Sequence, residues 1–181
     1  MRIFLALKFS EEEKRNINIH VEEYRKHFTH LRWTRVENYH CTLFFIGEMN
    51  EESVTRLRAS LHEYDLSMLL TPITLSPAEF FHTNDHATVV QLPVAPPYQW
   101  LKELYVMVKP IVDNYNPVVH NTYIPHITIA RTKQKFHKTD YSFFEENPVS
   151  LSLSPHTLVL YQSTSDSEGL LYQEIDSFSL R

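Results

Sequence analysis

The chain has 181 residues, of which 43% are hydrophobic and 22% are charged, so its length and composition suit a globular protein with one well-packed core. Its formal net charge of −5 argues against a protein that holds long nucleic acid on a basic face, although an enzyme acting on one phosphate remains open. No apolar stretch approaches the roughly 20 residues of a membrane-spanning helix. The single cysteine, Cys41, excludes an intrachain disulfide and agrees with a cytoplasmic location.

The N-terminal half of the sequence alternates strand patterns with amphipathic helix patterns. In chain order, the predicted elements are a strand at 2–9, a helix at 11–28, an extended piece at 31–34, a turn at 35–38, a strand at 40–46 and a helix at 51–64. Ser10 and Glu13 have capping-box spacing at the start of the first helix. Asn50 is the expected N-cap of the second helix, and Gly47 is expected to end the strand before it.

The C-terminal half continues the alternation and ends in a hairpin. Its predicted elements are strands at 72–81 and 86–93, a helix at 98–115, a strand at 124–131, a loop at 132–148, and strands at 151–162 and 171–179. Turns are expected at 83–85 and 163–169, and Pro110 is expected to kink or shorten its helix. Mixed strands and helices of this kind predict an α+β fold with mostly antiparallel sheets.

Two segments share the pattern histidine, any residue, threonine, aliphatic residue. They are His40-Cys41-Thr42-Leu43 and His126-Ile127-Thr128-Ile129. Residues i and i+2 of a strand point to the same face, so each segment should aim one imidazole and one hydroxyl in the same direction. Cys41 and Ile127 should then point the other way. The spacing of the segments also suggests two duplicated lobes, each with strand, helix and strand, related by a pseudo-two-fold axis.

Two imidazoles that face each other across a small cleft can act as general base and general acid, because their ordinary pKa lies near neutrality. Such a pair suits cleavage of a phosphodiester, in which one ring takes a proton from water and the other gives one to the departing alkoxide. The hydroxyls of Thr42 and Thr128, with the guanidinium of Arg131, would supply donors to the phosphate without a metal. Strict alternation would point Arg131 away from His126 unless a bulge intervenes.

Other interpretations of these residues stay open. A single His-x-Thr segment would most often be incidental, and a metal held by the two histidines is a weaker alternative because neither has a carboxylate two or four positions later. Cys41 could be a thiol nucleophile, although a small buried residue is the favoured interpretation. Tyr123 could stack a nucleotide base. Core packing is favoured for Phe44 and Trp33.

The residues around both segments resemble the 2H phosphoesterase superfamily, and within it the RNA 2′,3′-cyclic phosphodiesterases long labelled 2′-5′ RNA ligases. The first signature block corresponds to residues 32–48 and the second to residues 125–131. Two further stretches look like the opening strand and the closing hairpin of the family, namely residues 1–7, and residues 158–163 with Gly169 and Tyr172. Departures are mild, since Cys41 and Tyr39 stand where aliphatic residues are more usual.

The resemblance implies a bilobal α+β fold, with two mostly antiparallel sheets, helices on the outside and a central cleft. Residues 1–181 would then form a single domain of two intertwined lobes with one motif each. It further implies that His40 is the proton donor to the leaving oxygen and that His126 is the proton acceptor that activates water. Thr42 and Thr128 would hold the phosphate, with Arg131 beside them.

The implied reaction opens a terminal 2′,3′-cyclic phosphate of RNA to a 2′-phosphomonoester, and its reversal would form a 2′-5′ bond. The expected partners are RNA ends or nucleotides that carry a 2′,3′-cyclic phosphate, with no cofactor, no metal, no membrane and no obligatory protein partner. A closely related alternative keeps the chemistry but takes a small nucleotide as substrate. An RNA-binding protein with a decayed site and a metal-dependent hydrolase are the alternatives from other classes.

Overall fold

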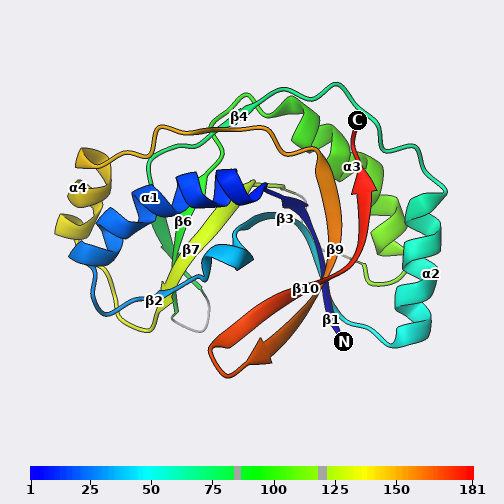
Figure 1. The fold of residues 1–181 in the computed structure, drawn as a ribbon, viewed down its shortest axis with the longest axis horizontal. Helices are drawn as coiled ribbons and strands as arrows, with labels where there is room; N and C mark the ends of the chain where they lie inside the picture. The colour runs from blue at the N-terminus through cyan, green and yellow to red at the C-terminus, as the bar shows by residue number, and fades with distance from the viewer. Residues whose placement is uncertain (84–86, 118–121) are drawn as a thin grey trace.

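The computed structural model describes residues 1–83, 87–117 and 122–181 and contains two four-stranded antiparallel sheets (Figure 1). The strands are β1 (Arg2–Lys8), β2 (Arg32–Trp33), β3 (His40–Glu48), β4 (Ile73–Thr74), β5 (Glu79–His82), β6 (Thr88–Pro93), β7 (His126–Thr132), β8 (Ser152–Leu153), β9 (Thr157–Asp166) and β10 (Gly169–Ser179). The helices are α1 (Glu11–His27), α2 (Glu51–His62), α3 (Gln99–Asp113) and α4 (Lys138–Glu146), with a 3-10 turn η1 (Val36–Asn38). This arrangement confirms the α+β prediction.

The two sheets draw their strands from interleaved parts of the chain. One has the order β10-β9-β1-β3 and the other β2-β7-β6-β5, while β4 and β8 form a separate pair. Helices α2 and α3 lie beside the first sheet, and α1 and α4 lie beside the second (Figure 1). Whether the chain is one domain of two duplicated lobes, and whether a cleft separates them, stay predictions.

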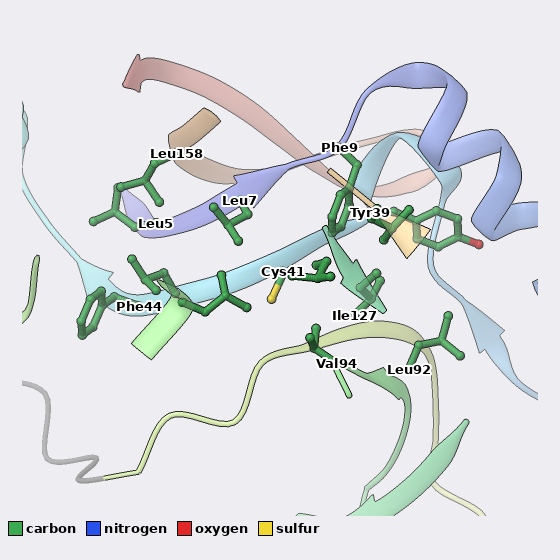
Figure 2. Close-up of a cluster of buried hydrophobic side chains, with 14 of the residues drawn as sticks. Leu5, Leu7, Phe9, Tyr39, Cys41, Phe44, Leu92, Val94, Ile127 and Leu158 are labelled. Carbon is green, nitrogen blue, oxygen red and sulfur yellow. The ribbon is translucent and has the colours of Figure 1, made fainter. Parts of the chain in front are cut away.

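The main core fills the space between the two motif strands. Cys41 of β3 and Ile127 of β7 have no exposed surface and belong to one cluster with Leu5 and Leu7 of β1 (Figure 2). Strands β3 and β7 contact each other, so this cluster joins the two sheets. The opposite face of β1 packs separately, where Phe4 meets a small cluster on β9. The core therefore takes the odd-numbered residues of both motifs and leaves the histidines and threonines on the other face.

Local sequence signals set most element boundaries as predicted. Helix α1 begins with the expected capping box between Ser10 and Glu13, and the side chain of Asn50 caps α2 by accepting from the Ser53 amide at 2.8 Å. Gly47 adopts a φ of +94° but β3 continues past it to Glu48, so the expected stop was placed too early. Helix α3 runs through Pro110 and ends at Asp113, slightly before its predicted end.

Four predicted elements were wrong in type or extent, among them the strand expected at 151–162, which forms two strands, β8 and β9, separated by residues 154–156. Residues 138–146 form α4 instead of a loop, because Phe143 stacks on His27 at 3.7 Å and Phe144 is buried against α1. The predicted strand 72–81 splits into β4 and β5 around Pro77, and the final turn shrinks to two residues because β9 continues to Asp166. The predicted turn residues Asn84 and Asp85 lie outside the described residues.

Candidate active site

His40 and His126 occupy equivalent places, each as the first residue of its strand. The Nδ1 atom of His40 lies 2.6 Å from the carbonyl oxygen of Asn38, and that of His126 lies 2.9 Å from the carbonyl oxygen of Ile124. A carbonyl only accepts, so Nδ1 carries the proton in both neutral rings. Each Nε2 is therefore the atom that presents a lone pair, or a second proton, to a substrate.

The threonine of the first motif contacts its own histidine. Thr42 Oγ1 lies 2.9 Å from His40 Nε2, and because Nδ1 holds the ring proton, the hydroxyl donates to Nε2. Thr128 stands at the matching place on β7, where its side chain is half-buried like that of Thr42. Both hydroxyls thus lie on the same face of their strand as the neighbouring imidazole, as the alternation predicted.

The two motifs meet through the core side of β3. The Cys41 thiol interacts with the backbone of His126, which brings the middle of the first motif against the start of the second. The charge of a protonated His126 would also lower the pKa of His40. Burial raises the pKa of the Cys41 thiol to about 11, so this residue is a core side chain and not a nucleophile at neutral pH.

A β-bulge places Arg131 on the face of the histidines. Val90 of β6 pairs with Ala130 and Gln91 pairs with Thr128, which leaves Ile129 as an extra residue in β7. Ile129 and Ala130 are consequently both buried, and Arg131 returns to the exposed face that carries His126. Its positive charge lowers the pKa of both histidines.

Strand β3 carries a bulge at the same step of its motif. Leu5 of β1 pairs with Phe44 and Ala6 pairs with Thr42, so Leu43 is the extra residue. Phe45 follows on the exposed face, at the place that corresponds to Arg131 in the second motif. The guanidinium of Arg2 lies over the Phe45 ring at 5.4 Å.

Both imidazoles favour the neutral form in the protein without substrate. Burial lowers the pKa of His40 to about 4, against the opposing effect of the Asn38 carbonyl. Burial also lowers the pKa of His126, and the charge of Arg131 adds to this effect, while the Ile124 carbonyl opposes it. A ring that must donate a proton therefore needs a nearby negative charge, which a bound phosphate would supply.

Sequence reasoning missed an aromatic support beneath His40. The ring of Phe4 lies 5.1 Å from the His40 ring, and Tyr172 meets the same ring edge-on at 5.1 Å. Tyr161 completes the group at 6.3 Å. The alternation of β1 and β9 could have placed Phe4 and Tyr161 on one face, but their pairing with β3 is a tertiary feature that no local pattern reveals.

The structure does not bring Tyr123 together with the other predicted site residues. Its ring stacks on Tyr105 at 5.0 Å, and its hydroxyl lies 3.6 Å from the Cys41 thiol, on the core side of β3. Its role in stacking a base stays a prediction that this placement does not favour. Within the described residues, no three His, Cys, Asp or Glu side chains gather as a metal site would require, and no helix has the length and apolar character to cross a membrane.

The chain is similar to known phosphoesterases. The family model described as LigT like phosphoesterase matches residues 7–85, which include the first motif. An RNA 2′,3′-cyclic phosphodiesterase of Thermotoga maritima is 24% identical over 96% of this chain and 92% of its own length. Another, from Methanocaldococcus jannaschii, is 25% identical over 97% of this chain and 98% of its own length.

A solved structure from Thermus thermophilus shows the same fold. It is 23% identical, has a TM-score of 0.75, and covers 100% of this chain and 98% of its own. The chain shares its fold with this structure, and it is similar to LigT-like phosphoesterases over residues 7–85 and to the two RNA 2′,3′-cyclic phosphodiesterases over nearly its whole length.

Proposed function

We propose that this phosphoesterase hydrolyses the terminal 2′,3′-cyclic phosphate of RNA to a 2′-phosphomonoester, with His40 as proton donor and His126 as proton acceptor. The observation that carries the proposal is the matched pair of imidazoles, each with Nδ1 on a backbone carbonyl, which makes Nε2 the ring atom for proton transfer. Two relatives that bear the name RNA 2′,3′-cyclic phosphodiesterase support the substrate. A cytoplasmic site of action is part of the proposal and rests on the single, buried cysteine.

In the proposed reaction, Nε2 of His126 takes a proton from water as the water oxygen forms a bond to phosphorus. The bond between phosphorus and O3′ breaks, and Nε2–H of His40 gives its proton to O3′. The products are a 2′-phosphate and a 3′-hydroxyl. His126 has gained one proton and His40 has lost one, so the pair of rings carries the same number of protons before and after the reaction. The same step with a 5′-hydroxyl in place of water would form a 2′-5′ bond through the same two rings.

The donors around the histidines suit the charge that develops on the phosphate. The hydroxyls of Thr42 and Thr128 can donate to the non-bridging oxygens, and Arg131 adds a positive charge on the same face. The short 2.6 Å contact from His40 Nδ1 to the Asn38 carbonyl supports the donor role of His40, because a carbonyl stabilises an imidazolium. The assignment of the two roles otherwise follows the family resemblance.

Product analysis tests the proposed reaction directly. In excess EDTA, the purified protein should convert an oligonucleotide with a 2′,3′-cyclic phosphate end to a product with a 2′-phosphate, resolved by chromatography against both standards. A 3′-phosphate product would show that the other ester bond breaks, and loss of all activity in EDTA would reveal a required metal. A parallel reaction with a mononucleotide cyclic phosphate tests the alternative substrate, which the net charge of −5 favours over long RNA.

Replacement of Arg131 by alanine should weaken substrate binding and shift the pH dependence upward. Loss of one charge-assisted contact to phosphate predicts a KM roughly 10-fold higher. Removal of the positive charge should also raise the pKa of both His40 and His126, because Arg131 lowers both. Steady-state kinetics across pH measures both effects. Arg56→Ala is the matched control, since Arg56 is exposed on α2 and pairs with Glu52. An unchanged KM would remove Arg131 from the proposed site.

A further inference from the structure

The side chain of Asn38 joins two distant parts of the chain beside His40. Asn38 ends the turn η1 and is 5% exposed. Its Nδ2 donates to the carbonyl oxygen of Leu170 at 2.7 Å, and its Oδ1 accepts from the backbone N–H of Tyr172 at 3.2 Å. The donor and the acceptor of the carboxamide thus both pair with the backbone of β10, as the backbone of a neighbouring strand would.

The backbone carbonyl of Asn38 accepts the hydrogen bond from Nδ1–H of His40. The carbonyl oxygen of Asn38 is the atom that lies 2.6 Å from His40 Nδ1. Tyr172, whose amide is bound by the Asn38 side chain, also packs its ring against the imidazole. The β9–β10 hairpin therefore contacts His40 directly through Tyr172 and indirectly through Asn38.

A second attachment holds the hairpin turn to the start of η1. Arg35 Nη1 donates to both carboxylate oxygens of Asp166 at 2.9 Å, and its Nη2 lies 3.5 Å from Glu168. These groups are more exposed than Asn38, so they contribute less than the buried carboxamide. The segment that precedes β3 is consequently held at both of its ends by the same hairpin.

The second motif differs at the equivalent position. The carbonyl that binds His126 Nδ1 belongs to Ile124, whose side chain is 59% exposed. An aliphatic side chain offers no hydrogen bond that could anchor its carbonyl. Two backbone carbonyls thus accept equivalent hydrogen bonds, but among the described residues a buried side-chain clamp is found only at the carbonyl that serves His40.

We propose that Asn38 is a positioning residue for His40, and that its carboxamide fixes the carbonyl which holds the proton on Nδ1. The inference rests on the proposed role of His40 in catalysis. If the clamp is removed, the carbonyl moves with its segment and the Nδ1–H loses a fixed acceptor. The ring is then free to rotate, and its proton can move to Nε2 in the neutral form.

The test uses two variants of the full chain. Asn38→Ala removes both contacts to β10, and Asn38→Asp keeps the size and the acceptor for Tyr172 but loses the donor to Leu170. We expect each to lower kcat by about 10- to 100-fold, since a misplacement near 1 Å has that effect, while KM changes by less than about 3-fold. The control is Asn50→Ala, which removes an N-cap from α2 and should lower Tm without changing kcat.

Nitrogen NMR of the imidazoles gives a readout that general destabilisation would not move. The neutral His40 ring should carry its proton on Nδ1 in the wild type and in Asn50→Ala, and should show a mixture of tautomers in the Asn38 variants. A wild-type ring protonated on Nε2, or a folded Asn38 variant with wild-type kcat and tautomer, would overturn the inference. The NMR result does not depend on turnover, so an inactive wild type would count against the proposed function alone.

Discussion

Replacement of either His40 or His126 by alanine should lower kcat/KM by about 100- to 10,000-fold, the usual contribution of a positioned acid or base. Each ring acts through Nε2, and alanine leaves neither a base for water nor an acid for O3′. The double variant should lose little more than the worse single variant, because the two rings act in one coupled proton transfer. Hydrolysis of a cyclic-phosphate oligonucleotide at several enzyme concentrations measures these losses.

His156→Ala is the matched control for these variants. The Nδ1 of His156 also faces the carbonyl two residues earlier, but at 3.5 Å and in an exposed setting outside both motifs in the sequence. Its removal should leave kcat/KM unchanged. Near-normal turnover by His40→Ala or by His126→Ala would refute the assignment of that residue as acid or base. Additive losses in the double variant would instead show that the rings act in separate steps.

The dependence of kcat/KM on pH should have its maximum below pH 6.5. The productive free enzyme carries one proton on the pair, and this state is most populated between the two pKa values. Burial lowers the pKa of His40 to about 4 and brings the pKa of His126 below its ordinary value of 6.5, so both limbs lie on the acidic side. Above the higher pKa the pair loses its single proton, no acid is left for O3′, and kcat/KM should fall about tenfold per pH unit.

The pH profile is measured from about pH 4 to pH 9 at substrate concentrations well below KM, with circular dichroism at each pH to exclude unfolding. The Arg131→Ala variant should move the whole bell toward higher pH, because both histidines then bind protons more readily. A wild-type maximum above pH 7 would contradict the neutral state of the rings in the free enzyme. A flat profile would mean that a step without proton transfer limits kcat/KM.

Local periodicity was sufficient to predict the chemistry-bearing face of each motif strand. The burial of Cys41 and Ile127, with half-exposed neighbours on either side, follows directly from strand alternation. The capping residues of α1 and α2 were likewise visible, because a cap is a relation between residues three positions apart. In each of these features, the residues that interact in space are also close together in the sequence.

Features that depend on distant partners were not predictable. Helix α4 has a polar sequence, and its aromatic residues become a packing face only against α1. The bulge at Ile129 has a weak local signal, the consecutive apolar residues before Arg131, but only the pairing with β6 reveals it. The clamp at Asn38 joins residues more than 130 positions apart, as its contact with Leu170 shows, so no window along the sequence could contain it.

The equivalent bulges of β3 and β7 bear on how the enzyme could distinguish the oxygen that attacks phosphorus from the oxygen that leaves it. The frame of two histidines, two threonines and two bulges is nearly the same when its halves are exchanged. A frame of that kind gives an oxygen that attacks phosphorus the same surroundings as one that departs. Direction must then come from side chains that break the equivalence, and the step after each bulge supplies such a pair, an aromatic ring at Phe45 and a guanidinium at Arg131.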